Sequence, residues 1–160
     1  MKKHMRGRLW WLGPAVLMIV TLFIWCHSLA PAEQSSAESG RIVALLAPIL
    51  GKIKLEPGQW QNLVRKAAHM TEFAVLGMAW MANLVRYKAV TWPRKAEIAV
   101  AVCMATALID ETIQLSVPGR SGQISDVWID LLGAVIGIAL VSAVIGLITK
   151  TGRQCEQGHE

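Results

Sequence analysis

The fold is decided by a polar stretch, residues 110–133, that reads DETIQLSVPGRSGQISDVWIDLLG. An apolar run lies on each side of it, at residues 98–109 and 131–148. This pattern predicts a polar hairpin between two membrane-embedded helices. A carboxylate costs about 2.5 to 3.5 kcal/mol at the centre of a bilayer on insertion scales, and less near the interface. The acidic residues gathered at this hairpin therefore need partners or a task.

The composition places the chain in the membrane class. Of its 160 residues, 54% are apolar and only 17% are charged, and the mean hydropathy is +0.43. An ordinary soluble domain is less apolar than this. The net charge is +5, but the basic residues fall in short clusters beside apolar runs rather than on one face with interleaved aromatics. We therefore expect the lipid bilayer, and not nucleic acid, as a partner.

The apolar segments predict an all-α integral membrane four-helix bundle that forms one domain over residues 1–160. Each segment is long enough to cross a hydrocarbon core at about 1.5 Å per residue. The first exceeds the apolar length of roughly 7 to 15 residues that is usual in a secretory signal, so we expect an uncleaved anchor. The expected spans are residues 9–29, 67–85, 97–115 and 125–149.

An extra short helix is predicted at about residues 36–50, between the first two spans. Ser35 and Glu38 have the spacing of a capping box at its start. The helix is too short to span, so it either lies in the membrane surface or packs against the bundle. Its apolar face is formed by Ile42, Leu45, Leu46, Ile49 and Leu50.

Antiparallel spans with short loops bring the start of the second, the end of the third and the start of the fourth to one side of the membrane. Polar residues recur there at helical spacing. Gly133 and Gly137 would let helices approach closely beneath them. The candidate ligand-binding residues on this side are Arg65, Lys66, His69, Glu72, Asp110, Glu111, Gln114, Arg120, Ser121, Asp126 and Asp130.

These motifs carry a family resemblance. They comprise Arg65-Lys66 with His69 and Glu72-Phe73, then Asp110-Glu111 with Gln114, and finally the PGRSG loop at 118–122 with Asp126 and the DLLG run at 130–133. Over roughly residues 23–148 the chain resembles the VanZ-like family of bacterial envelope membrane proteins. A weaker match to the family pattern lies at Cys26-His27-Ser28, where members of that family often carry a pair of serines. The resemblance implies a four-helix membrane protein of the bacterial cell envelope. It also implies a link to glycopeptide (teicoplanin) susceptibility, and so to antibiotic resistance.

The orientation follows from the basic flanks. Lysines and arginines cluster before the first span, between the second and third, and after the fourth. They indicate a multi-pass protein of the bacterial cytoplasmic (inner) membrane with both termini cytoplasmic. The polar residues then face the extracytoplasmic side, where lipid-linked wall precursors and glycopeptides are met.

The charge of this polar side leaves several chemistries open. Acids outnumber lysines and arginines there, so His69 is protonated, an acid is protonated, or a cation is bound. The metal candidates are His69, Glu72 and Asp110. Acid–base catalysis could also use Glu111 and Asp126, whereas an ion-pair lattice that locks the helices would use the same residues.

Arg120 has two readings of its own. Its guanidinium could grip a phosphate, with help from backbone amides beside the glycines of its loop. Alternatively, it pairs with Glu111 or Asp126. No nucleotide loop or heme motif is present in the sequence, so the only cofactor considered is a divalent cation.

Three functions remain. The first is an envelope protein whose outer pocket binds a lipid-linked wall or glycan precursor or a glycopeptide. The second is a membrane enzyme acting on such a lipid. The third is a small transporter or proton relay, which ranks last because the polar residues occupy one end without matching charges through the bilayer.

Overall fold

The computed structural model describes residues 10–50, 56–120 and 122–157. In these ranges the chain forms helices and no strands, as predicted. The helices are α1 (Leu12–Ser28), α2 (Ala32–Leu50), α3 (Pro57–Leu84), α4 (Trp92–Leu115) and α5 (Ile124–Gln157).

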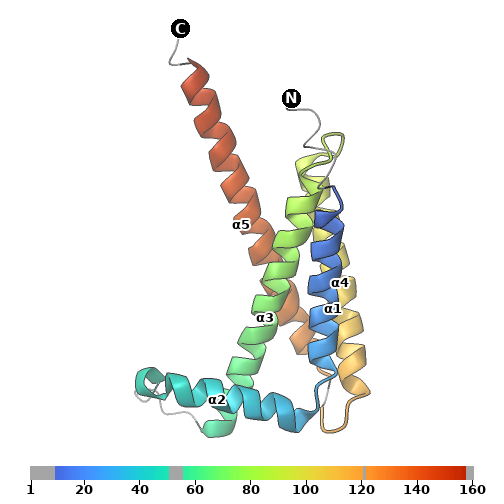
Figure 1. Cartoon of the computed structure of the whole chain (residues 1–160), viewed down its shortest axis with the longest axis vertical. Coiled ribbons are helices and arrows are strands. Elements are labelled where there is room, and N and C mark those ends of the chain that lie inside the picture. The colour runs from blue at the N-terminus through green and yellow to red at the C-terminus, as the bar shows by residue number, and fades with distance from the viewer. Residues whose placement is uncertain (1–9, 51–55, 121, 158–160) are drawn as a thin grey trace.

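The helices form one long assembly with α2 across its base (Figure 1). α1, α3 and α4 run alongside one another, while α5 crosses α3 and then leans away from it (Figure 1). α2 turns by 105° from α1 after a break at residues 29–31. The start of α1 and the end of α5 lie at the end of the assembly opposite α2 (Figure 1).

Proline marks the start of two helices. Pro57 opens α3, and the backbone N–H of Glu56 donates a 3.0 Å hydrogen bond to Oε1 of Gln59, which satisfies a donor at the helix end. Pro93 lies in the first turn of α4, after Thr91 in extended conformation. The ring of proline fixes φ near the helical value and needs no hydrogen bond there. α3 therefore begins at Pro57, ten residues before the span expected from residue 67.

The start of α2 differs from the prediction. The helix begins at Ala32, directly after Pro31, rather than near residue 36. Ser35 lies inside it, where its N–H donates to the carbonyl of Pro31 at 3.1 Å. The predicted capping box of Ser35 and Glu38 is therefore wrong, because Pro31 already starts the helix one turn earlier. At the other end of the chain, α5 continues to Gln157, beyond the expected boundary at 149.

The contact between α3 and α5 is the most extensive in the fold. A Cβ on Gly133 would lie well inside 3.0 Å of the backbone of Met70, and one on Gly137 would do the same at Ala74. Gly77 of α3 meets the backbone of Ala134 in the same way. These positions allow the two backbones to touch, so the predicted close approach at the glycines is confirmed.

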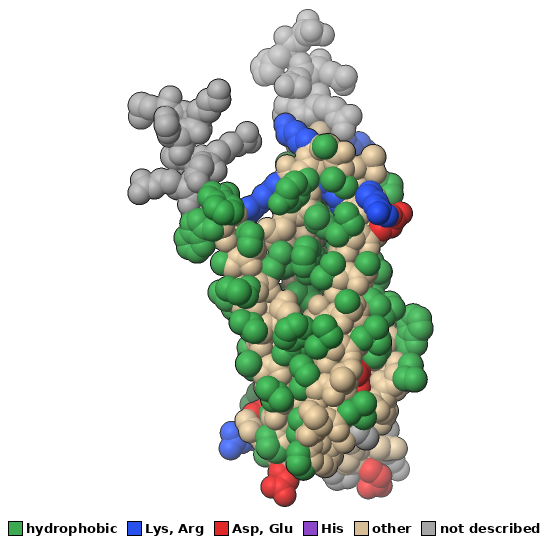
Figure 2. Space-filling model, turned by 90° about the vertical axis from the view of Figure 1, so that its right-hand side faces the viewer, with side chains coloured by type: hydrophobic (Ala, Val, Ile, Leu, Met, Phe, Trp, Pro, Cys, Tyr) green, Lys and Arg blue, Asp and Glu red, His purple; other side chains and the backbone are tan. Residues whose placement is uncertain are grey.

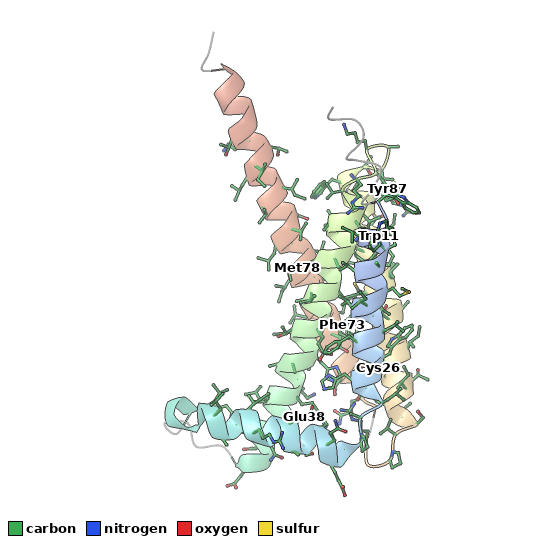
Figure 3. The ribbon with its side chains drawn as sticks, viewed as in Figure 1. Trp11, Cys26, Glu38, Phe73, Met78 and Tyr87 are labelled. Carbon is green, nitrogen blue, oxygen red and sulfur yellow. The ribbon has the colours of Figure 1, made fainter. Side chains whose placement is uncertain are left out.

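Apolar side chains fill the interior beside this crossing. One cluster includes Ile24, Phe73 and Leu76, which are fully buried between α1 and α3. A second cluster, farther from α2, joins Met81, Ala99 and Ile138. The labelled Phe73 in Figure 3 lies in the middle of the assembly.

The helices are those of a membrane protein. α4 is long and apolar enough to span a bilayer, with a mean hydropathy of 1.6, and so is residue range 124–151 of α5, with 2.7. α1 and α2 together add a third span if this bent pair crosses the bilayer as a single broken span. Hydrophobic side chains cover the middle of the face in Figure 2, with charged side chains gathered toward the two ends. Among the described residues, two or three spans meet this length and hydropathy criterion rather than the expected four, so the four-helix membrane bundle stays a prediction.

Candidate functional site

Polar side chains from four helices meet near the end of the assembly that carries α2. Asp110 is fully buried, and Asp130 and His69 are 1% and 8% exposed. Cys26 and Glu38 mark this end in Figure 3, whereas Trp11 and Tyr87 mark the opposite one. We define the polar centre as His27 and Ser28 of α1, His69 and Glu72 of α3, Asp110 and Gln114 of α4, and Asp130 of α5.

Asp110 is held from two sides. Oγ of Ser28 donates a 2.6 Å hydrogen bond to its Oδ1, and Nε2 of Gln114 donates a 2.9 Å bond to its Oδ2. Gln114 lies one turn after Asp110 on α4, so the helix itself sets the second contact. Since a carboxylate oxygen has two lone pairs, both oxygens of Asp110 keep capacity for a further partner.

Two histidines stack beside Asp110. The rings of His27 and His69 lie 5.9 Å apart between centroids, with an interplanar angle of 9°. Nδ1 of His27 is 2.7 Å from Oε1 of Glu72, and Nε2 of the same ring is 3.7 Å from Oε2 of Glu38. His69 Nδ1 lies 3.8 Å from Oδ2 of Asp110. The imidazoles thus connect acids of α2, α3 and α4.

Asp130 completes the buried part of the centre. Its carboxylate, an imidazole nitrogen of His69 and a carboxylate oxygen of Asp110 lie within 4.8 Å of one another. Neither oxygen of Asp130 has a hydrogen-bond partner in the structure. The structure therefore brings together His69, Asp110 and Asp130, whereas the sequence-based metal set had Glu72 in place of Asp130.

Arg120 reaches this centre from the loop between α4 and α5. Its Nη1 donates a 3.1 Å hydrogen bond to the carbonyl oxygen of Ser28, while its Nε and Nη2 are buried without a partner. Gly119 precedes it with φ of 78°, a conformation that favours glycine. Burial, and then the positive charge of Arg65, lower the pKa of the Arg120 guanidinium from its ordinary value.

Arg120 does not make the ion pair considered from the sequence. Asp126 pairs instead with the ammonium of Lys66, and Oε2 of Glu111 accepts a 2.7 Å hydrogen bond from the backbone N–H of Gln123. Both acids lie near the polar centre but have their own partners. The guanidinium therefore keeps two N–H-bearing nitrogens available.

Two of the predicted ligand-binding residues, Arg65 and Ser121, are not placed in the polar centre. Arg65 donates to Oδ1 of Asn62 at 3.0 Å and lines an open pocket of about 190 Å³ between α2 and α3. Ser121 lies outside the described residues. The other lining residues of the pocket are Ser35, Ser36, Ser39, Gly58, Gln61, Asn62 and Gln123.

The sequence did not assign His27, Ser28 and Glu38 to the site. His27 and Ser28 close the last turn of α1, and Glu38 lies on α2 just beyond the bend. For His27 and Ser28, the sequence signal was a polar pair at the end of the first apolar segment. Ser28 donates its hydroxyl to Asp110.

Fold and site together define an all-α membrane protein with a buried polar centre near one end of its helices. A model of the VanZ/LLP1 family matches residues 14–146, which include every residue of that centre. The chain belongs to the VanZ/LLP1 family. No curated protein and no solved structure matches it.

Proposed function

We propose that this chain is an integral protein of the bacterial cytoplasmic membrane that binds the anionic headgroup of a lipid-linked wall or glycan precursor. In this proposal α1, α3, α4 and α5 span the bilayer, and α2 lies in its outer surface. Membership of the VanZ/LLP1 family and the apolar helices support the membrane setting. An influence on glycopeptide susceptibility, teicoplanin included, would follow from binding such a precursor.

The observation that carries the proposal is the state of Arg120. One guanidinium nitrogen is anchored on the carbonyl of Ser28, and the other two have no protein partner although they are buried. A buried unpaired donor costs about 1 to 3 kcal/mol, and more when it is charged. A phosphate oxygen pair would satisfy both nitrogens, because a guanidinium presents parallel N–H groups at that spacing.

An apolar groove supports a lipid-linked ligand over a soluble one. A cavity of about 280 Å³ lies between α1 and α3, and its lining is apolar apart from Thr71 and Glu72. Glu72 also binds His27, so the groove meets the polar centre at this residue. A hydrocarbon chain along the groove would bring its headgroup to the centre. The apolar lining consists of Ile19, Val20, Phe23, Ile24 and Val75.

The basic residues support an outward-facing centre. Arg86, Lys88, Arg94 and Lys95 surround the connection between α3 and α4, at the end of the helices opposite α2. Short loops rich in lysine and arginine stay in the cytoplasm. The centre would then open to the extracytoplasmic side, with both termini cytoplasmic.

A membrane enzyme is the second candidate. It is favoured by the 2.7 Å contact of His27 with Glu72 and by the neighbouring His69, since an imidazole paired with a carboxylate can serve as a general base. A transporter is less well supported. Among the described residues, the buried acids and histidines lie near one end of the helices, and the cluster of Met81, Ala99 and Ile138 continues the interior beyond them, with Lys95 as a buried charged side chain on α4.

The test is thermal unfolding of the detergent-purified protein with and without undecaprenyl phosphate. A ligand that binds only the folded state raises Tm with its concentration. We expect this rise for the unaltered chain and its loss in Arg120→Ala. Arg120→Lys should not restore it, because an ammonium lacks the forked donors.

Two results would contradict the proposal. One is an unaltered chain whose Tm does not respond to the lipid. The other is an equal response in Arg120→Ala. Undecaprenol, which lacks the phosphate, serves as the matched control ligand. A neutral lipid that stabilises as well as the phosphate would place the affinity in the groove alone.

A further inference from the structure

We propose that His69, Asp110 and Asp130 form a binding site for a divalent first-row metal ion, Zn²⁺ or Mn²⁺. Each residue comes from a different helix, α3, α4 and α5 respectively. One potential ligand atom from each lies within 4.8 Å of the others. All three side chains are buried, so the site is shielded from bulk water.

The carboxylate of Asp130 is the strongest argument. It is 1% exposed, and neither of its oxygens has a hydrogen-bond partner. Buried carboxylates are normally paired, hydrogen-bonded or bound to a metal, because removing an unpaired charge from water is costly. No protein group forms a hydrogen bond or an ion pair with Asp130 among the described residues. Its carboxylate nevertheless lies beside the imidazole of His69 and the carboxylate of Asp110.

No basic side chain balances this pair of aspartates. Across the described residues, neither Lys nor Arg forms an ion pair with Asp110 or Asp130. Lys66 is engaged by Asp126, and Arg120 donates its hydrogen bond to the carbonyl of Ser28 rather than to either aspartate. His69 is the nearest candidate, with Nδ1 3.8 Å from Asp110. A divalent ion between the carboxylates would offset both charges.

The donor set selects the class of ion. Imidazole nitrogen suits zinc and other transition ions, whereas carboxylate oxygen suits zinc, manganese and the harder cations. One nitrogen with two carboxylates therefore favours Zn²⁺ or Mn²⁺ over Ca²⁺ or Mg²⁺. Ligand bonds of about 2.0 to 2.2 Å would draw the donors closer than in the structure.

Asp110 is already oriented for this role. Ser28 and Gln114 each donate a hydrogen bond to one of its oxygens, which fixes the plane of the carboxylate. Groups behind a ligand commonly tune metal affinity by 10- to 100-fold or so. The stacked ring of His27 restrains His69 in the same way.

The experiment uses the full-length chain without an affinity tag, treated with EDTA and then equilibrated with Zn²⁺, Mn²⁺, Mg²⁺ or Ca²⁺. We expect about one tightly held Zn²⁺ or Mn²⁺ per chain by elemental analysis and a Tm that rises with its concentration. Asp130→Asn and His69→Gln should lose both. Glu97→Gln is the control, an exposed acid at the far end of α4, and should keep both.

X-ray absorption at the metal edge supports the test on the unaltered chain, in case a variant fails to fold. Nitrogen and oxygen ligation with one imidazole is expected. Ligation by sulfur or by several imidazoles would overturn the proposal, as would equal metal content in Asp130→Asn. No bound metal, combined with a higher Tm in Asp130→Asn, would show that Asp130 is a neutral buried acid.

This inference does not depend on lipid binding. Metal content is measured without lipid, and the response to undecaprenyl phosphate can be measured after EDTA. A chain that binds lipid but no metal would overturn the metal site alone. The converse result would overturn the proposed function alone.

Discussion

The hydroxyl of Ser28 and the carboxylate of Asp110 are joined by a 2.6 Å hydrogen bond that ties the last turn of α1 to α4. Both residues are fully buried, and Gln114 completes the contact from the next turn of α4. The first helix is thus fastened to the polar centre by its final residue. The same residue receives Arg120 on its carbonyl oxygen.

Ser28→Ala should therefore destabilise the protein. A hydrogen bond to a charged group contributes about 1.5 to 3 kcal/mol, and the substitution also leaves Oδ1 of Asp110 without this donor. Thermal unfolding in detergent should show a clear fall in Tm. Ser116→Ala is the control, because that exposed hydroxyl bonds only to the carbonyl of Ile113. Equal Tm values for the two variants would contradict this account.

Gly133→Ala should also lower the stability. Its Cβ would press on the backbone of Met70, and overpacking of this kind typically costs about 1 to 3 kcal/mol. Gly146→Ala provides the comparison on the same helix, since a Cβ there meets nothing within 4 Å. We expect a lower Tm for the first variant only. A similar loss in both would contradict this account, because alanine has a higher helix propensity than glycine and should not destabilise an open position such as 146.

The ion pair of Lys66 and Asp126 should have a measurable coupling. Their side chains are 24% and 19% exposed, whereas those of the pair Arg94–Glu97 are 67% and 62% exposed. A double-mutant cycle to alanine should give roughly 0.5 to 3 kcal/mol for the first pair. The exposed pair should give about 0 to 1 kcal/mol. Additive effects at Lys66 and Asp126 would show that the contact carries no stability.

The proposed orientation predicts the outcome of reporter fusions. A fusion at Lys88 should report the cytoplasm, and one at Gly119 the extracytoplasmic side, because the basic loop lies opposite the polar centre. Alkaline phosphatase and green fluorescent protein give opposite signals at each position. A cytoplasmic result at Gly119 would reverse the proposed membrane orientation.

The sequence was sufficient for the helical fold and for the meeting of residues from α3, α4 and α5. Helical spacing and short connections place His69, Asp110 and Asp130 toward the same end, and the structure brings these side chains together. Glycine at 133 and 137 indicated the close crossing in the same way. Such features follow from local periodicity and helix direction.

The contributions of α1 and α2 were harder to predict. A polar pair at the end of an apolar helix commonly faces headgroups, so nothing local distinguishes Ser28 as a partner of Asp110. Its role depends on how α1 is rotated against α4, which is set by packing around Ile24. The start of α2 was misplaced because Ser35 and Glu38 matched a cap, whereas the helix begins after Pro31.

The crossing of α3 and α5 has a consequence for genetics. Asp130 and Gly133 are neighbours on α5, so a bulky residue at the glycine would also displace the carboxylate from His69 and Asp110. An unbiased screen for loss of function should recover alleles at Gly133 and Gly137 as readily as at the acids. The glycine alleles should differ from the acid alleles in having reduced protein abundance. Glycine has no side-chain chemistry to lose, so its replacement would act through packing and stability.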